Sequence, residues 1–134
     1  YQDILDYVGV KGELGKVVAG GAMMGPAVEN LSYPTTKTTS GLIMLSAAAA
    51  EPPQVNPCIR CGRCVEYCPM GLEPVEVNQA YAARDVQELG KLHVDYCFNC
   101  GSCTFVCPAK RPCTQMMGLA KAFYLGEIKK GGNK

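Results

Sequence analysis

The sequence predicts an α+β chain in which a part with short strands precedes an all-helical part built around cysteines. Three observations predict this fold class. Residues 1–50 alternate between β-prone pieces and glycine turns. Two cysteine blocks of identical spacing follow, at residues 58–69 and 97–108. The segments after each block carry apolar residues at helical spacing.

Length and composition exclude several classes of protein. The chain has 134 residues, and its 13 Lys and Arg against 12 Asp and Glu give a net charge of +1, so we expect no nucleic-acid partner. The longest nearly apolar run, Gly41–Ala50, is half of the ~20 residues that a membrane-spanning helix needs. We therefore expect no transmembrane segment, which leaves a peripheral partner of a membrane complex open. The chain opens without Met or a basic signal region, and we expect it to begin inside a longer protein or after processing.

The N-terminal part, residues 1–50, is expected to hold one helix and two strands. The spacing of Ile4, Leu5 and Val8 indicates that Gln2–Val8 is the end of a helix, and the glycines that follow break this helix. Lys16–Ala19 is a short β-prone run, and Thr35–Ser46 is predicted as a second strand. The methionine pair between these strands, Met23 and Met24, is expected in the core.

A linker is predicted between the two parts. The alanines before it suit one turn of helix, and residues 51–57 contain three prolines that stop a helix and favour extended backbone. The predicted organisation is therefore an N-terminal part over residues 1–50, a linker over 51–57 and a helical part over 58–134.

The cysteines carry the strongest signal. Eight of the nine form two copies of C-x2-C-x2-C-x3-C-P, the bacterial iron–sulfur run. The two copies are Cys58, Cys61, Cys64 and Cys68 followed by Pro69, and Cys97, Cys100, Cys103 and Cys107 followed by Pro108. Three thiolates two residues apart converge on one cluster from a tight loop, and Gly62 and Gly101 relax the backbone after the second cysteine of each block.

The fourth cysteine of each block comes one residue late, and in two-cluster proteins it ligates the other cluster. We therefore assign two crossed ligand sets for two [4Fe–4S] clusters. The first set is Cys58, Cys61, Cys64 and Cys107, and the second is Cys97, Cys100, Cys103 and Cys68. The proline after each crossing ligand turns the chain.

Three other interpretations of the cysteines compete. A disulfide scaffold suits small secreted domains, but here the count is odd and no secretory signal opens the chain. A pair of structural zinc sites would use two short-spaced cysteine pairs far apart in sequence. If the eight cysteines were only buried core residues, they would not be expected to repeat with the same spacing in two blocks. Iron–sulfur ligation is favoured over all three.

Two further residues are interpreted as structural. Cys113 fits neither block, and core packing is favoured over a redox-sensing thiol. The single histidine, His93, lies between Leu92 and Val94 and is interpreted as a packed or surface residue, because no nucleophile–base pair accompanies it.

Three helices are predicted around the cysteine blocks. Pro74 suits the first turn of one helix, which continues at helical spacing through Val77, Ala80, Tyr81 and Arg84. Asp85 is expected to cap the next helix, with Glu88 three residues on and a buried side formed by Val86, Leu89 and Leu92. Pro112 opens the third helix, whose apolar face is Met116, Met117, Ala120, Phe123, Tyr124 and Ile128. The 28 residues from Pro69 to Tyr96 leave room for helices. This connection favours an all-helical dicluster ferredoxin over the small β-sheet kind. Its fold is expected to depend on cluster binding.

Both cysteine blocks and the sequences that flank them resemble the C subunit of the Rnf electron transport complex. The resemblance includes Cys-Ile-Arg-Cys-Gly-Arg-Cys-Val-Glu-Tyr-Cys-Pro-Met-Gly-Leu from Cys58 and Cys-Phe-Asn-Cys-Gly-Ser-Cys-Thr-Phe-Val-Cys-Pro-Ala-Lys-Arg-Pro from Cys97. Upstream, Gly-Gly-Ala-Met-Met-Gly at residues 20–25 is similar to that family's Gly-Gly-Pro-Met-Met-Gly, and Lys37–Gly41 resembles the strand entry that follows it. Cys113 departs from the family, where an aliphatic residue is usual.

The resemblance implies a partial β-grasp domain of the soluble-ligand-binding (SLBB) type at residues 1–50, followed by the dicluster domain. It implies that FMN and NAD bind only in an N-terminal half that this sequence does not include. It also implies other subunits of a membrane electron transport complex as partners, and a peripheral place on the cytoplasmic face of a bacterial inner membrane.

The function expected from the residues and the resemblance is one-electron transfer through two [4Fe–4S] clusters in an ion-translocating ferredoxin:NAD oxidoreductase. Arg60, Arg63, Lys110 and Arg111 lie in or beside the cysteine blocks, where they either stabilise the reduced state or form a solvated basic rim. No independent catalytic site is expected in this chain. Three alternatives stay open: a cobalamin-reductase component of a propanediol-utilisation microcompartment, a structural module stapled by clusters, and a zinc-binding adaptor.

Overall fold

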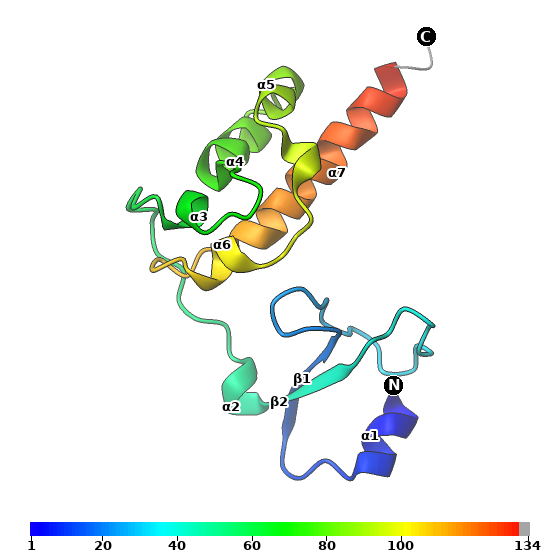
Figure 1. Cartoon of the computed structure of the whole chain (residues 1–134). Coiled ribbons are helices and arrows are strands. Elements are labelled where there is room, and N and C mark those ends of the chain that lie inside the picture. Colours follow the sequence, from blue (N-terminus) through cyan, green and yellow to red (C-terminus); the bar gives the residue numbers. More distant parts are fainter. Residues whose placement is uncertain (132–134) are drawn as a thin grey trace. The chain divides into compact units, whose positions relative to one another are not determined.

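The chain divides into two compact units, one over Tyr1–Pro53 and the other from Gln54 onward. The computed structural model describes residues 1–131 (Figure 1). The fold is mixed, with a small antiparallel sheet in the N-terminal unit and helices in the C-terminal unit. None of the helices in the described part of the chain is both long and apolar enough to cross a membrane.

The N-terminal unit is built on a two-stranded antiparallel sheet. It contains α1 (Gln2–Val8), β1 (Leu14–Ala19), β2 (Leu42–Ser46) and α2 (Ala47–Ala50). The strands pair Val18 with Ile43 and Val17 with Met44, and a register shift interrupts the pairing near Gly15. A Cβ at Gly15 would lie 2.6 Å from the Cα of Ala47, so only glycine lets the strand approach α2 this closely.

The predicted helix and first strand of this unit are confirmed, and α2 forms from the predicted alanine turn. Gly9 ends α1 in the left-handed conformation, with its N–H bonded to the Leu5 carbonyl. The buried residue of α1 is Leu5, whereas Val8, which the apolar spacing places on the same side of the helix, is exposed. The helical apolar spacing therefore identified the helix but only one of its core contacts.

Two expectations for this unit are wrong. The second strand begins at Leu42, not Thr35, because Thr36 and Thr39 fold residues 36–39 into a turn. The Thr36 N–H donates to Oγ1 of Thr39 at 3.1 Å, and the Thr39 N–H donates to the Thr36 carbonyl at 3.0 Å. Such local bonds compete with strand pairing. Met23 and Met24 are 46% and 58% exposed and therefore lie outside the core.

The C-terminal unit is helical, as predicted. Its elements are α3 (Arg63–Glu66), α4 (Pro74–Ala82), α5 (Val86–Lys91), the 3-10 helix η1 (Val94–Tyr96), α6 (Ser102–Phe105) and α7 (Cys113–Gly131). The long helix α7 packs against α4, α5, α6 and η1 (Figure 1). The helix α7 is therefore the central helix of the unit, and the helices that connect the two cysteine-bearing loops pack against it.

The predicted helix starts of this unit are confirmed by local geometry. Pro74 occupies the first turn of α4, where its missing N–H costs no hydrogen bond. Asp85 caps α5, since its Oδ1 accepts from the Glu88 N–H at 2.9 Å. Pro112 directly precedes α7. Arg84, predicted to continue the first helix, instead follows it with φ 57°.

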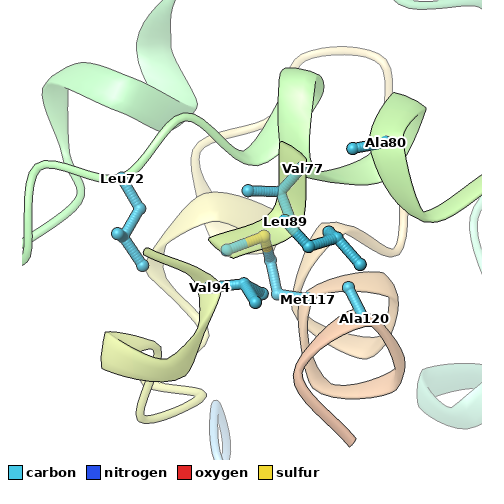
Figure 2. Packing of buried hydrophobic residues seen from close by; sticks show 7 residues of the cluster. All are labelled: Leu72, Val77, Ala80, Leu89, Val94, Met117 and Ala120. Atoms are coloured by element: carbon cyan, nitrogen blue, oxygen red, sulfur yellow. The ribbon is translucent and has the colours of Figure 1, made fainter. Parts of the chain in front are cut away.

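The core of the C-terminal unit lies between α4, α5, η1 and α7 (Figure 2). Its buried residues are Leu72, Val77, Ala80, Leu89, Val94, Met117 and Ala120. Partly buried thiols of Cys68, Cys97 and Cys103 pack against this core. At one edge, Arg84 lies over the rings of Tyr81 and Phe123, 4.7 and 4.9 Å from their centroids. The core is thus continuous with the cysteine-bearing loops.

Candidate iron–sulfur site

Each cysteine block forms a tight loop that leads into a one-turn helix. Gly62 and Gly101 precede α3 and α6 with φ of 77° and 87°, a left-handed conformation that glycine adopts without strain. Two residues before each glycine, Arg60 and Asn99 are also left-handed, with φ of 51° and 55°. Both loops therefore follow the same backbone path, as the repeated spacing predicts.

The similarity between the two loops extends beyond the cysteines at a constant offset of 39 residues. Gly71 and Lys110 lie at this offset and are both left-handed. The offset also joins the first residues of α4 and α7, Pro74 and Cys113. The unit is therefore an internal repeat of two loop–helix segments, and we use this offset to compare their sites position by position.

A first cavity in this unit gathers thiols from both blocks. It has a volume of about 280 Å³ and is lined by Cys58, Cys61 and Cys64 together with Cys107 from the second block. These are the four residues of the first predicted ligand set. The residues of α4 that line the same cavity are Val75, Asn78, Gln79 and Ala82. Their spacing of three and four residues places them on one face of the helix.

The second cavity repeats this arrangement with the blocks exchanged. It is lined by Cys97, Cys100 and Cys103 together with Cys68 from the first block. Leu72, Pro74 and Met117 close it, and its free volume is only about 20 Å³. The structure thus brings together the residues of each predicted set, including both crossing cysteines.

Polar hydrogens surround several of the sulfur atoms. The N–H of Arg60 donates to Sγ of Cys58 at 3.4 Å, and the N–H of Leu72 donates to Sγ of Cys68 at 3.3 Å. In the second site, Oγ1 of Thr114 lies 3.5 Å from Sγ of Cys103. Thr114 is itself held by Thr104, whose Oγ1 accepts from the Thr114 N–H at 2.8 Å. Such contacts stabilise negative charge on sulfur.

Burial opposes ionisation of the thiols when no metal is bound. It raises the pKa of Cys64, and it raises the pKa of Cys103 against the opposing hydrogen bond with Thr114. Iron ligation requires thiolates, so a bound cluster must supply the positive charge that keeps these sulfurs ionised. Cluster binding at these sites would therefore release protons.

Cys113 is buried, as the core-packing interpretation predicts, with 5% of its surface exposed. It also lines the first cavity, beside the predicted ligands. Burial, reinforced by the neighbouring thiols of Cys107, Cys103 and Cys64, raises its pKa to about 12. Cys113 is therefore a neutral thiol in the wall of the first site.

The basic residues near the blocks gather at the first cavity. Arg60, Arg63 and Arg111 line it, whereas no lysine or arginine lines the second cavity among the described residues. Lys110 is exposed close to Cys107, the predicted crossing ligand, and its N–H donates to the Cys107 carbonyl at 3.1 Å. His93 is an exposed residue whose ring stacks on Tyr96, with centroids 5.3 Å apart. The surface alternative predicted for His93 is the one observed.

Two polar residues of the first cavity were missed from the sequence, Asn78 and Gln79 of α4. With its carboxamide oriented to suit both neighbours, Gln79 accepts from Nη2 of Arg60 at 2.9 Å and donates to Oε2 of Glu76 at 3.2 Å. The available signal was the repeat itself, because polar residues at positions 78 and 79 correspond to apolar Met117 and Gly118 at the 39-residue offset.

The donor chemistry of both cavities fits a [4Fe–4S] cluster. Each has four cysteine thiols, glycine-containing loops that wind tightly around them, and N–H groups directed at sulfur. Within residues 1–131, no three His, Cys, Asp or Glu side chains are placed to hold a single metal ion. The thiols are arranged around cavities instead.

Residues 57–110 match the family model described as a 4Fe-4S dicluster domain, and the helical fold and cysteine-lined cavities of this region agree with that description. The C-terminal region of the chain is homologous to the C subunit of Rnf-type complexes, as the resemblance predicted.

Three relatives illustrate this homology. The chain is 42% identical over 77 residues to the C subunit of the ion-translocating oxidoreductase complex of Rhodobacter capsulatus, covering 58% of this chain and 15% of that protein. It is 41% identical over 75 residues to the C subunit of the proton-translocating ferredoxin:NAD(+) oxidoreductase complex of Clostridium ljungdahlii, covering 55% and 16%. It is 36% identical over 87 residues to the C subunit of the Na(+)-translocating ferredoxin:NAD(+) oxidoreductase complex of Acetobacterium woodii, covering 64% and 19%. The chain thus spans less than a fifth of each of these relatives.

Proposed function

We propose that this chain relays single electrons through two [4Fe–4S] clusters. When bound, each cluster takes up and gives back one electron. The observation that supports this proposal is that each cavity is lined by cysteines of both blocks: three come from one block and the fourth comes from the other. Crossed ligation of this kind is how two-cluster proteins hold their clusters.

The proposed ligands of the first cluster are Cys58, Cys61, Cys64 and Cys107, and those of the second are Cys97, Cys100, Cys103 and Cys68. The rest of the site serves to stabilise charge on these sulfurs. The backbone N–H groups of Arg60 and Leu72 donate to ligand sulfur, and three arginines add positive charge around the first cavity. These groups favour the reduced, more negative state.

The proposed setting is the whole C subunit of an Rnf-type complex. The names of the relatives describe ion-translocating complexes and ferredoxin:NAD(+) oxidoreductases. We place this chain between membrane subunits and a flavin and nicotinamide site elsewhere in the protein, peripherally at the cytoplasmic face. In this proposal the N-terminal unit is the C-terminal part of an SLBB-type β-grasp domain, joined to the clusters through the linker at residues 51–57.

Anaerobic purification with metal and sulfide analysis tests the proposal. About eight iron and eight sulfide per chain are expected for two cubane clusters. A redox titration followed by electron paramagnetic resonance (EPR) should then show two reversible, magnetically interacting one-electron centres. Zinc in place of iron would support an adaptor instead. Clusters that cannot be reduced reversibly would leave only a structural role.

A further inference from the structure

The two cysteine-lined cavities differ in polarity at one matched pair of residues on their helices. Asn78 of α4 lines the first cavity, and Met117 of α7 lines the second at the 39-residue offset. Met117 is 1% exposed and belongs to the core. The repeat therefore presents a carboxamide to the first site where it presents a thioether to the second.

The carboxamide of Asn78 has an unmet bonding requirement. Its Oδ1 is shielded from solvent and, among residues 1–131, has no hydrogen-bond partner. A buried polar atom without a partner is unfavourable. Asn78 also lies centrally on the cavity-facing side of α4, with Val75 three residues before it and Ala82 four residues after it. An apolar residue at this position would avoid the cost, as Met117 does in the second half.

A group bound in the first cavity would supply the partner that this carboxamide lacks. Asparagine carries two N–H donors, and rotation of the amide about its terminal bond exchanges the nitrogen and oxygen positions. Thiolate and sulfide sulfurs of a [4Fe–4S] cluster are hydrogen-bond acceptors, whereas neutral thiols offer the amide little. The neighbouring Gln79 is already engaged with Arg60 and Glu76, which leaves Asn78 as the free amide of this face within the described chain.

We propose that Asn78 donates a hydrogen bond to a sulfur of the first [4Fe–4S] cluster and thereby raises its reduction potential, a contact that the second site lacks. This inference rests on the proposed function. Reduction by one electron, supplied in the test by dithionite, adds negative charge that the N–H group stabilises. Asn78 is thus a potential-setting residue rather than a ligand, and it makes the two clusters inequivalent.

An EPR-monitored redox titration of the cluster-loaded protein tests this. Replacing Asn78→Leu should reduce the equilibrium constant for reduction of one cluster about tenfold, which for one electron is about 59 mV toward more negative potential. The other cluster should keep its potential. Asn78→Asp keeps the shape, and its ionised carboxylate has no donor and adds negative charge, so it should shift the same cluster in the same direction even if the leucine variant folds poorly.

Two further variants show which cluster is affected and control for replacing a helical amide side chain by leucine. Thr114→Val removes the hydroxyl beside Cys103 and should lower the potential of the other cluster only. Gln115→Leu changes an exposed residue of α7 and should leave both potentials unchanged. Unchanged potentials in both Asn78 variants, or a shift in the cluster that Thr114→Val affects, would overturn the inference. A wild-type protein without reversible clusters would instead refute the proposed function.

Discussion

Pro74 and Cys113 occupy equivalent positions in the two halves of the C-terminal unit. Each is the first residue of its helix, each is buried, and each lines the cavity that the opposite block dominates. Pro74 can only pack at this position, because it has neither a thiol nor an N–H group. The equivalence therefore supports a packing role for Cys113, although it lies among the proposed ligands.

Replacing Cys113→Ala should leave both clusters in place. The iron content should remain at about eight per chain, because Cys113 belongs to neither ligand set. The lost packing at a buried position should lower the free energy of unfolding by about 1 kcal/mol, measured as a reduced thermal midpoint under anaerobic conditions. Loss of half of the iron in this variant would show that Cys113 is a ligand.

The parts of the fold predicted from sequence were those with local physical signals. Pro74, the Asp85 cap and Pro112 placed three helices, because each acts within one turn of its own position. The predicted second strand starts too early, because β2 pairs only where β1 lies opposite it. Thr36 and Thr39 form a turn instead. Pairing depends on partners distant in sequence, which a β-prone run does not reveal.

Crossed ligation predicts that substitutions in different blocks remove the same cluster. Cys58→Ser and Cys107→Ser should leave the same residual EPR spectrum, because both thiols line the first cavity. Cys68→Ser and Cys97→Ser should share the other spectrum, because both line the second. EPR of each dithionite-reduced single variant provides the comparison.

The matched control for these variants is Cys113→Ala, which should retain both signals. If Cys107→Ser instead resembled Cys97→Ser, each block would hold its own cluster. The crossed assignment would then be wrong, although the chain would still bind two clusters.

Replacing Asp85→Ala should destabilise α5. The change removes the acceptor of the 2.9 Å bond from the Glu88 N–H and leaves that donor without its cap. Loss of an N-cap of this kind costs about 1 kcal/mol. The thermal midpoint of the loaded protein should fall, whereas Gln87→Ala on the exposed side of the same helix should leave it nearly unchanged. Equal effects of the two changes would argue against the cap.

Replacing Leu89→Ala should be more costly than the loss of the cap. Leu89 is fully buried in the core between α4, η1 and α7, so its truncation leaves a cavity (Figure 2). Truncations of this kind cost about 2–5 kcal/mol. Leu119→Ala removes the same atoms from a side chain that is 53% exposed and is the matched control. Similar thermal midpoints for both variants would contradict the packing seen in this core.

The cysteines that gather at each cavity were predictable from the sequence, but the other residues that line it were not. Cysteine spacing carries the predicted ligand pattern along a short stretch of chain, so the four cysteines that line each cavity could be named from sequence. Asn78 and Gln79 reach the first cavity only because α4 turns one face toward it. That orientation depends on the packing of α4 against α7, through residues such as Val77 and Met117.

The two clusters should contribute unequally to the helical fold. Cys68, Cys97 and Cys103 of the second site pack against the core, whereas Cys58 and Cys61 of the first site are exposed. A cluster bound by core-packed thiols cross-links the segments that the core joins, so its free energy of binding contributes to folding. Removing the second cluster with Cys97→Ser should therefore reduce helix content, seen in far-ultraviolet circular dichroism, and lower the thermal midpoint. Removing the first with Cys61→Ser should retain most of both. Equal losses in the two variants, at matched iron content, would show that the core does not distinguish the sites.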